Sequence, residues 1–362
     1  MRHSFLLLSL VFASNLLATE YGKVTSQKVA EGVYLFTTTP YGVGLSGNSV
    51  AVLSSDGVLV FDTNGLPETA DTVLKGIQKL TDKPVLYVVN SHWHWDHWAG
   101  NQIYRSAFPN AKIITHSKTL EQMQQVEPRW NDAGLKTGLP GYIKQLEEQL
   151  GKSKEEQNPQ TEISDQEAFL NAAKKFLAEK TSLRKTYPDT TFQNSMALRP
   201  GGREIRIQHA RAITIGDTYV FLPKERILIT GDILLSPYPY AIGGAYPEDW
   251  LRTLEKFAAM NPSVIIPGHG DPQNPEFLQR HIKLFRTILH QVKQAKHSGS
   301  TIEQTKVSIG QQYRQLASML GISDERVASE FKAYFLDVFV PRAYRELESP
   351  LGDLPDGLPD RK

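Results

Sequence analysis

The sequence contains no cysteine among its 362 residues. A disulfide framework and a thiolate metal site are therefore excluded, and any bound metal must be held by histidine and carboxylate side chains. A surplus of charge is also missing, because the formal net charge is +1 and no basic run stands out. This balance argues against nucleic acid as a partner. Neither a glycine-rich phosphate loop nor a G-x-S-x-G serine elbow is found, so the sequence predicts no nucleotide site and no serine nucleophile.

Long apolar runs are missing everywhere except at the start of the chain. There, Arg2 precedes an apolar run over residues 5–17 and the small residue Ala18, at which a signal peptidase can cut. The run is too short for an ordinary spanning helix. We therefore predict a signal peptide over residues 1–18, a mature chain that begins near Thr19, a periplasmic or secreted location, and no integral membrane span after signal removal. The alternative is a short uncleaved anchor.

Strand-rich and helical segments alternate in two halves of the chain, and 40% of all residues are hydrophobic, enough for a sizeable core. Runs rich in β-branched and aromatic residues predict strands, whereas apolar residues at helical spacing predict helices. In the first half we expect strands within 32–36, 48–63 and 83–89 and a helix over 66–80. In the second half we expect strands within 204–223, 226–232 and 263–270 and a helix over 247–260.

Residues 118–193 separate the two halves and are rich in Gln, Glu and Lys, which predicts a helical insertion with a solvated face. Ser164 and Glu167 have the spacing of a capping box and predict a helix start. A C-terminal helical region is expected over residues 276–347, with apolar spacing typical of helices near 275–294 and 323–340. Residues 348–362 are rich in Pro, Gly and Asp and predict a loose tail.

The stretch "SHWHWDHWAG" at residues 91–100 gathers His92, His94, Asp96 and His97 just after a β-rich run. At the end of an extended strand His92 and His94 point the same way, and a turn through Asp96 and His97 directs a second pair of ligands to a neighbouring point. Four residues of metal-binding types at this spacing indicate a metal site, with room for two adjacent ions. The alternative is an aromatic strand with solvent-facing imidazoles.

The H-x-H-x-D-H stretch resembles the signature of the metallo-β-lactamase fold superfamily, and the similarity covers roughly residues 28–118 and 194–275. Two further segments of that family are matched by Asp232 in "ITGDIL" and His269 in "IPGHGDP". The resemblance implies a four-layer αββα sandwich over residues 19–275, with residues 92–97, 232 and 269 in one cleft. It also implies metal ligands at the positions His92, His94, Asp96, His97, Asp232 and His269, with Asp232 bridging two ions.

One family segment is only partly matched. "AITIGDTYVFLP" fits the pattern H-T-x-G-D at Thr214, Gly216 and Asp217, but Ile213 stands at the ligand position. Isoleucine cannot coordinate a metal, so the site of His92 and His94 lacks one imidazole. His209 is four residues upstream, about 13 Å along an extended strand, and could replace the missing ligand only through a bulge or register shift. We favour an ordinary strand or surface histidine at 209.

Other candidates have weaker support. Asp62 in "VFDTNG" resembles the family's strand-end aspartate that supports the metal loop, although a turn-forming aspartate is the alternative. Tyr238 and Tyr240 follow the bridging aspartate and either face substrate or pack within their own loop. The tryptophans at 93, 95 and 98 either wall the pocket or pack in the core. His116 matches no ligand position and is interpreted as structural.

The expected chemistry is hydrolysis of a small acyl, ester, thioester, lactone or β-lactam-type substrate. One or two Zn²⁺ ions, held with Asp96 and Asp232 among their catalytic ligands, lower the pKa of bound water, and metal-bound hydroxide attacks the substrate. Two alternatives stay open. The first is an inactive or weakly active metal-binding protein, because Ile213 replaces a ligand histidine. The second is an iron-dependent enzyme that oxidises sulfur compounds. Metal content and activity with and without Ile213→His separate them.

Overall fold

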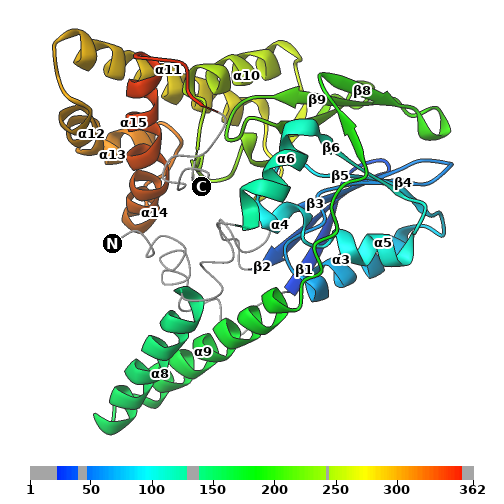
Figure 1. The fold of residues 1–362 in the computed structure, drawn as a ribbon, viewed down its shortest axis with the longest axis horizontal. Coiled ribbons are helices and arrows are strands. Elements are labelled where there is room, and N and C mark those ends of the chain that lie inside the picture. Colours follow the sequence, from blue (N-terminus) through cyan, green and yellow to red (C-terminus); the bar gives the residue numbers. More distant parts are fainter. Residues whose placement is uncertain (1–22, 40–46, 129–137, 242–243, 353–362) are drawn as a thin grey trace. The chain divides into compact units, whose positions relative to one another are not determined.

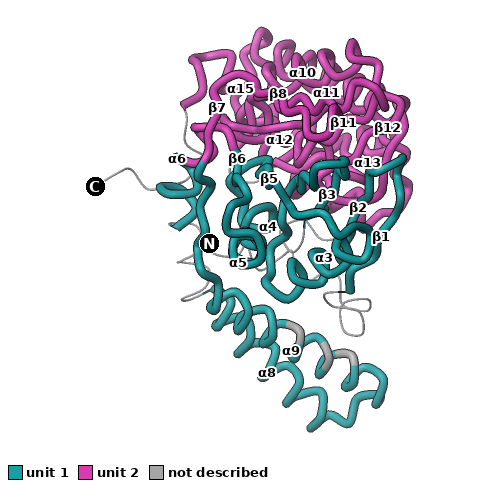
Figure 2. Tube along the Cα trace, turned by 90° about the vertical axis from the view of Figure 1, so that its right-hand side faces the viewer, with its two compact units in different colours: residues 1–114, 121–189 teal, residues 115–120, 190–362 magenta. Residues whose placement is uncertain are grey.

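The computed structural model describes residues 23–39, 47–128, 138–241 and 244–352. Within these ranges the chain forms two sheets and many helices, which confirms the mixed α/β class (Figure 1). Two compact units are distinguished in Figure 2: residues 1–114 with 121–189, and residues 115–120 with 190–362. The predicted signal peptide lies outside the described residues. Among the described helices, none combines the length and the apolar character that crossing a membrane requires.

The sheet of unit 1 has its strands in chain order. The first four strands pair antiparallel, and β4, β5 and β6 pair in parallel because helices carry the chain back between them. The last two residues of β6 belong to unit 2, as does β7, the seventh strand of the order. The bounds are β1 (Lys23–Ala30), β2 (Val33–Thr39), β3 (Ser49–Leu53), β4 (Val58–Phe61), β5 (Val85–Val89), β6 (Lys112–His116) and β7 (Thr190–Phe192).

The core of unit 1 forms where α3 covers the sheet. Pro67 occupies the first turn of α3, where its missing N–H costs nothing. Val73, Leu74 and Ile77 recur at helical spacing and are buried in one cluster with residues of β3, β4 and β5. The helices with residues in this unit are α3 (Pro67–Leu80), α4 (Trp95–Trp98), α5 (Asn101–Ala107), α6 (Ser117–Gln125), α8 (Leu139–Glu155) and α9 (Gln160–Thr181).

The predicted helical insertion contains the hairpin of α8 and α9. Its second helix begins at Gln160 after Pro159, so Ser164 lies inside the helix and the prediction of a helix start there is wrong. The ring of Pro159 disfavours the helical conformation for the residue before it, so the helix begins after the proline. The two helices pack on each other, and the last turn of α9 lies over the α4 turn of the same unit.

The sheet of unit 2 has the order β12-β11-β10-β9-β8. Its strands pair antiparallel except β11 and β12, which pair in parallel because α10 crosses between them. Asp232 and His269 follow these two parallel strands, which brings them to the same edge of the sheet. The bounds are β8 (Ser195–Leu198), β9 (Ile205–Ala210), β10 (Asp217–Leu222), β11 (Ile227–Ile229) and β12 (Val264–Ile266).

Aromatic rings hold the helices of unit 2 together. Trp250 of α10 meets Phe285 of α11 edge to face at 5.0 Å between ring centres, and Phe285 lies 4.9 Å from Phe339 of α15. The expected helix over 323–340 is interrupted by a π-helical turn, Lys332–Leu336. The helices are α10 (Pro247–Ala259), α11 (Pro275–His297), α12 (Ile302–Gly310), α13 (Tyr313–Ser318), α14 (Glu325–Phe331) and α15 (Asp337–Glu346), with 3-10 turns η2 (Pro200–Gly202) and η3 (Gly231–Ile233).

Candidate metal centre

The histidine-rich stretch forms a compact turn after β5 in unit 1. The chain leaves the strand at Val89, stays extended at His94, and turns helically over Trp95–Trp98. His92, Asp96 and His97 are all buried, and His94 is half-buried. Gly47 packs against this turn so closely that an added Cβ would lie 2.8 Å from Nδ1 of His97. The ring of His97 is therefore held in place by tight packing.

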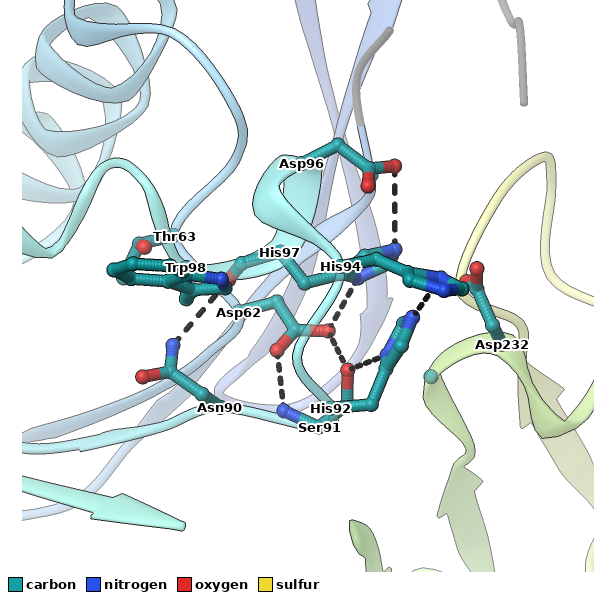
Figure 3. Close-up of polar contacts among 12 residues, drawn as sticks. Asp62, Thr63, Asn90, Ser91, His92, His94, Asp96, His97, Trp98 and Asp232 are labelled. Carbon is teal, nitrogen blue, oxygen red and sulfur yellow. Dashed lines mark hydrogen bonds and ion pairs between the residues drawn. The ribbon is translucent and has the colours of Figure 1, made fainter. Parts of the chain in front are cut away.

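The ring nitrogens and the carboxylate of this turn converge in pairs (Figure 3). Nε2 of His92 lies 2.8 Å from Nδ1 of His94, and Nε2 of His97 lies 3.4 Å from Oδ2 of Asp96. Two ligands about 2.1 Å from a tetrahedral ion stand about 3.4 Å apart. The pair of Asp96 and His97 thus has the spacing of two ligands on one divalent ion, whereas the rings of His92 and His94 are at hydrogen-bond distance and would have to separate slightly to share an ion.

Asp62 supports the turn from beneath. Its Oδ2 accepts hydrogen bonds from Nδ1 of His97 at 2.8 Å and from Oγ of Ser91 at 2.7 Å, and its Oδ1 accepts from the Ser91 N–H at 2.7 Å. Burial raises the pKa of Asp62, while the His97 and Ser91 contacts lower it. Because a carboxylate only accepts, His97 carries its proton on Nδ1 and presents the Nε2 lone pair to the site.

The same aspartate also controls His92 through Ser91. The Ser91 hydroxyl donates its proton to Asp62, so it accepts from Nδ1 of His92, 2.9 Å away, and leaves Nε2 of His92 with its lone pair. Asp62 adopts a left-handed backbone with φ of 59°, a conformation that aspartate tolerates better than most residues. These hydrogen bonds are the contacts that the predicted supporting role of Asp62 requires.

Amide side chains and tryptophans pack around the turn. Asn90 and Asn101 exchange hydrogen bonds through their amides, and Asn90 also donates to the carbonyl of His97. The indole N–H of Trp98 donates to the carbonyl of Trp93. The tryptophans at 93, 95 and 98 are all buried, so they pack in the core around the turn.

Unit 2 contributes its own pair of predicted ligands. Asp232 lies in the 3-10 turn η3 after β11, and His269 follows β12. Oδ1 of Asp232 lies 3.5 Å from Nε2 of His269, again close to the separation of two ligands on one ion. Gly268 lies against Asp232, and an added Cβ there would collide with the Oδ1 atom and lie 2.6 Å from the carbonyl carbon of Gly231. This close packing leaves Asp232 little freedom.

The loop that carries Ile213 is rigidly held. Asp217 accepts hydrogen bonds from the N–H groups of Ala212 and Thr214 at 3.0 and 2.9 Å, and from the Thr214 hydroxyl at 2.6 Å. Burial raises the pKa of Asp217 to about 7 despite these donors. Ile213 itself is buried and offers no ligand atom. Its comparison with a ligand histidine stays an interpretation.

His209 is engaged elsewhere in unit 2. Its Nε2 donates to the carbonyl of Ile215 at 2.9 Å, and its ring stacks on that of His116 with 3.9 Å between centres and planes 8° apart. His116 in turn donates from Nε2 to the carbonyl of Gln193 at 2.7 Å, and burial lowers its pKa to about 4. Neutral imidazoles can stack in this way, whereas two protonated rings would repel.

Tyr238 and Tyr240 are both buried and face the C-terminal helices of unit 2. The Tyr238 hydroxyl donates to Glu330 at 3.1 Å, and Tyr240 packs on Tyr334 with 5.1 Å between ring centres. Burial and the charge of Glu330 raise the pKa of Tyr238. Within the described residues, these contacts fasten the segment after Asp232 to α14 and the π-helical turn.

The family model of the metallo-beta-lactamase superfamily matches residues 42–269, more than half of the chain. The chain belongs to the metallo-β-lactamase superfamily, and it has the fold of that superfamily. Both the resemblance and the fold class predicted from the sequence are confirmed. At this coarse level the chain is related to metal-dependent hydrolases.

Individual relatives are distant. The chain is 24% identical over 224 residues to a linear primary-alkylsulfatase of Pseudomonas sp. (strain ATCC 19151), an alignment that covers 60% of this chain but only 40% of that protein. It is 21% identical over 278 residues to a type 2 metallo-beta-lactamase of Elizabethkingia meningoseptica, covering 75% and 88%. A metallo-beta-lactamase structure from Pontibacter korlensis matches with a TM-score of 0.52 at 16% identity, covering 73% of this chain and 99% of that chain. This last likeness shows the fold alone.

The sequence reasoning missed several residues of the turn's support. Ser91 and Asn90 directly precede the histidine motif, and their position beside it was the available signal. Lys180 had no such signal, because it lies in the helical insertion far along the chain, yet its Nζ lies over the ring of Trp95.

Proposed function

We propose that the chain is an exported metal-dependent hydrolase whose metal is held by His92, His94, Asp96 and His97 of unit 1 together with Asp232 and His269 of unit 2. The observation that carries this proposal is the spacing of the donor atoms, because all three pairs lie 2.8 to 3.5 Å apart within their own units. Membership of the superfamily supports joining the pairs into one centre. Zinc suits this set of imidazole and carboxylate ligands, and iron is the alternative.

A divalent ion bound there supplies a Lewis acid and a water molecule of lowered pKa. The residues of the chain supply the orientation. Asp62 fixes the tautomer of His97 directly and that of His92 through Ser91, so that both Nε2 atoms are available as donors. Asp96 and Asp232 add negative charge, which favours binding of a cation at this site. The burial of these groups excludes water and strengthens their electrostatic interactions.

The joining of the two pairs is tested by a double-mutant cycle of metal affinity. Asp96→Asn and His269→Ala each remove one ligand, one from each unit. If both residues bind the same ion, the two losses in affinity are not additive, because the second substitution acts on a site that is already impaired. Isothermal titration with Zn²⁺ and Co²⁺ measures the four constants. Strictly additive losses would contradict a shared ion.

The substrate class is proposed as a small acyl, ester, thioester, lactone or β-lactam compound. The names of the two curated relatives add primary alkyl sulfates and keep β-lactams among the candidates. The experiment is elemental analysis of the purified protein followed by a panel of these substrates, with and without a chelator. A protein that binds one metal and hydrolyses none of these compounds would refute the proposed chemistry while leaving the metal centre intact.

Ile213 favours a second candidate, a weakly active metal-binding protein. An isoleucine beside a cation removes one direct bond, and loss of a ligand costs metal affinity at least as much as the 10- to 100-fold typical of a residue that only supports one. We expect about one equivalent of tightly bound metal after dialysis, low hydrolytic activity, and a gain in both for Ile213→His. Two tightly bound ions in the unmodified protein, unaffected by His209→Ala, would show that another residue completes the site of His92 and His94.

Export is proposed from the apolar run over residues 5–17. Mass spectrometry of the protein from its native source should find a mature chain that begins near Thr19. An intact Met1 on cytoplasmic protein would contradict this proposal.

A further inference from the structure

Trp95 is the side chain through which the ligand turn is anchored. It is the first residue of α4 and lies between His94 and Asp96 in the sequence, so the position of its ring constrains the backbone of both. Gly65 lies so close to the ring that an added Cβ would collide with it, and Phe176 of α9 meets the ring edge to face at 5.6 Å. The ring belongs to a buried cluster shared by α8 and α9. The helical insertion thus supplies many of the side chains that surround Trp95.

Lys180 covers one face of the Trp95 ring. It lies in the last turn of α9, its side chain is buried, and its Nζ is 3.0 Å from the centre of the Trp95 ring, the geometry of a cation–π contact. Its Nζ has no hydrogen-bond partner among the described residues. Nearby lysines behave differently, because Lys175 pairs with Glu68 at 2.8 Å and Lys185 with Glu127 at 3.0 Å.

A lysine in this position is unfavourable for the stability of the fold. Burial lowers the pKa of Lys180, and the charges of Glu127 and Asp96 only partly oppose this effect. Replacing buried charged groups by apolar residues of similar size is often neutral or stabilising. Packing alone would be served equally well by a methionine at this site. Lysine differs from methionine in two respects: its amine, whose protonated form Glu127 and Asp96 favour, and the contact of that amine with the ring beside Asp96.

We propose that Lys180 is a positioning residue that holds Trp95, and through it His94 and Asp96, in the geometry that binds metal. This inference rests on the proposed metal-dependent function. It gives the helical insertion a role in the metal centre, because the last turn of α9 fixes the ligand turn of the same unit. Lys180 takes part in no chemical step of its own.

The test compares metal affinity with thermal stability in Lys180→Met. We expect the melting temperature to stay unchanged or rise, because a buried charge is removed, while affinity for Zn²⁺ and Co²⁺ falls by about 10-fold or more, as for other groups that orient ligands. The absorption spectrum of the Co²⁺-loaded protein should change as well, because the ligand geometry relaxes. Lys180→Arg keeps a cation that stacks on the ring and should restore both affinity and spectrum.

The matched control is Lys174→Met on the same helix, since Lys174 is exposed and pairs with Glu147 at 2.7 Å. It should leave affinity and spectrum unchanged. Unchanged or higher metal affinity in Lys180→Met overturns the inference, and so does an equal loss in Lys180→Met and Lys180→Arg. If instead the unmodified protein binds neither ion, the proposed function fails first, and the two failures are thereby distinguished.

Discussion

Replacing Asp62 by asparagine should misdirect the proton of one ligand histidine. The substitution keeps size and shape, and asparagine tolerates the left-handed φ of 59° at this position. Three donors point at the carboxylate: the N–H and hydroxyl of Ser91 and Nδ1 of His97. An asparagine has only one oxygen, so at least one of these donors must face its NH₂ group.

Either orientation of the asparagine is costly. If the NH₂ group faces His97, the ring must accept on Nδ1, which puts the proton on Nε2 and blocks the atom that would bind metal. If the oxygen faces His97, the NH₂ group faces the Ser91 N–H at about the 2.7 Å of the present contact. Loss of groups that orient metal ligands typically lowers metal affinity by about 10- to 100-fold, and this is the loss we expect.

Two measurements check this expectation. Competition with a chromophoric chelator gives the affinity for Zn²⁺, and the ¹⁵N chemical shifts of the His97 ring report which nitrogen carries the proton. Asp71→Asn is the control, because the Asp71 side chain is 44% exposed and its pair with Lys75 is worth little. Wild-type affinity in Asp62→Asn, with the proton still on Nδ1 of His97, would refute the role assigned to the carboxylate.

Two further variants test the packing of unit 2 and its response to pH. Gly268→Ala should displace Asp232, lower the free energy of unfolding by about 1–3 kcal/mol because the site becomes overpacked, and weaken metal binding. Chemical denaturation and metal titration measure these effects. The control is Gly151→Ala, because an added Cβ there meets open space. Burial lowers the pKa of His281 to about 4, so the unfolded chain takes up a proton near pH 6.5 before the folded one does. Stability is therefore lost as pH falls from about 6.5 to 4, by about 3 kcal/mol from this residue. His281→Met should flatten this part of the pH profile, whereas the exposed His290→Met should not.

The strands and long helices were predictable because their periodicity is local. The apolar spacing of 66–80 and 247–260 matches α3 and α10 to within a residue at each end. Lys23–Ala30 escaped prediction, because this edge strand is largely exposed and its polar residues carry no alternation of apolar side chains. The helix start expected at Ser164 was wrong for a different reason. A capping pattern also occurs inside polar helices, and Pro159 marks the boundary of this one.

The candidate site was predictable only where its residues adjoin a motif. Asp62 was found because it ends a strand in the same position as its counterpart in the family, and the structure supplies its contacts with Ser91 and His97. Lys180 could not be found, since its contact with Trp95 joins residues that are far apart in the sequence. Side-chain contacts of this kind depend on tertiary packing, which no local pattern encodes.

The parallel pairing of β11 and β12 has a consequence for how this chain could be altered. Asp232 and His269 are placed by two adjacent strand ends, in register from Ile227 with Val264 onward. The start of the segment between them also holds them together, because the Gly268 N–H donates to the carbonyl of Leu234 and the Ser236 N–H donates to the carbonyl of His269. Helix α10 lies further along this segment. Solvent-facing residues of α10 can therefore be exchanged together while both strand ends, and the two side chains that follow them, keep their places.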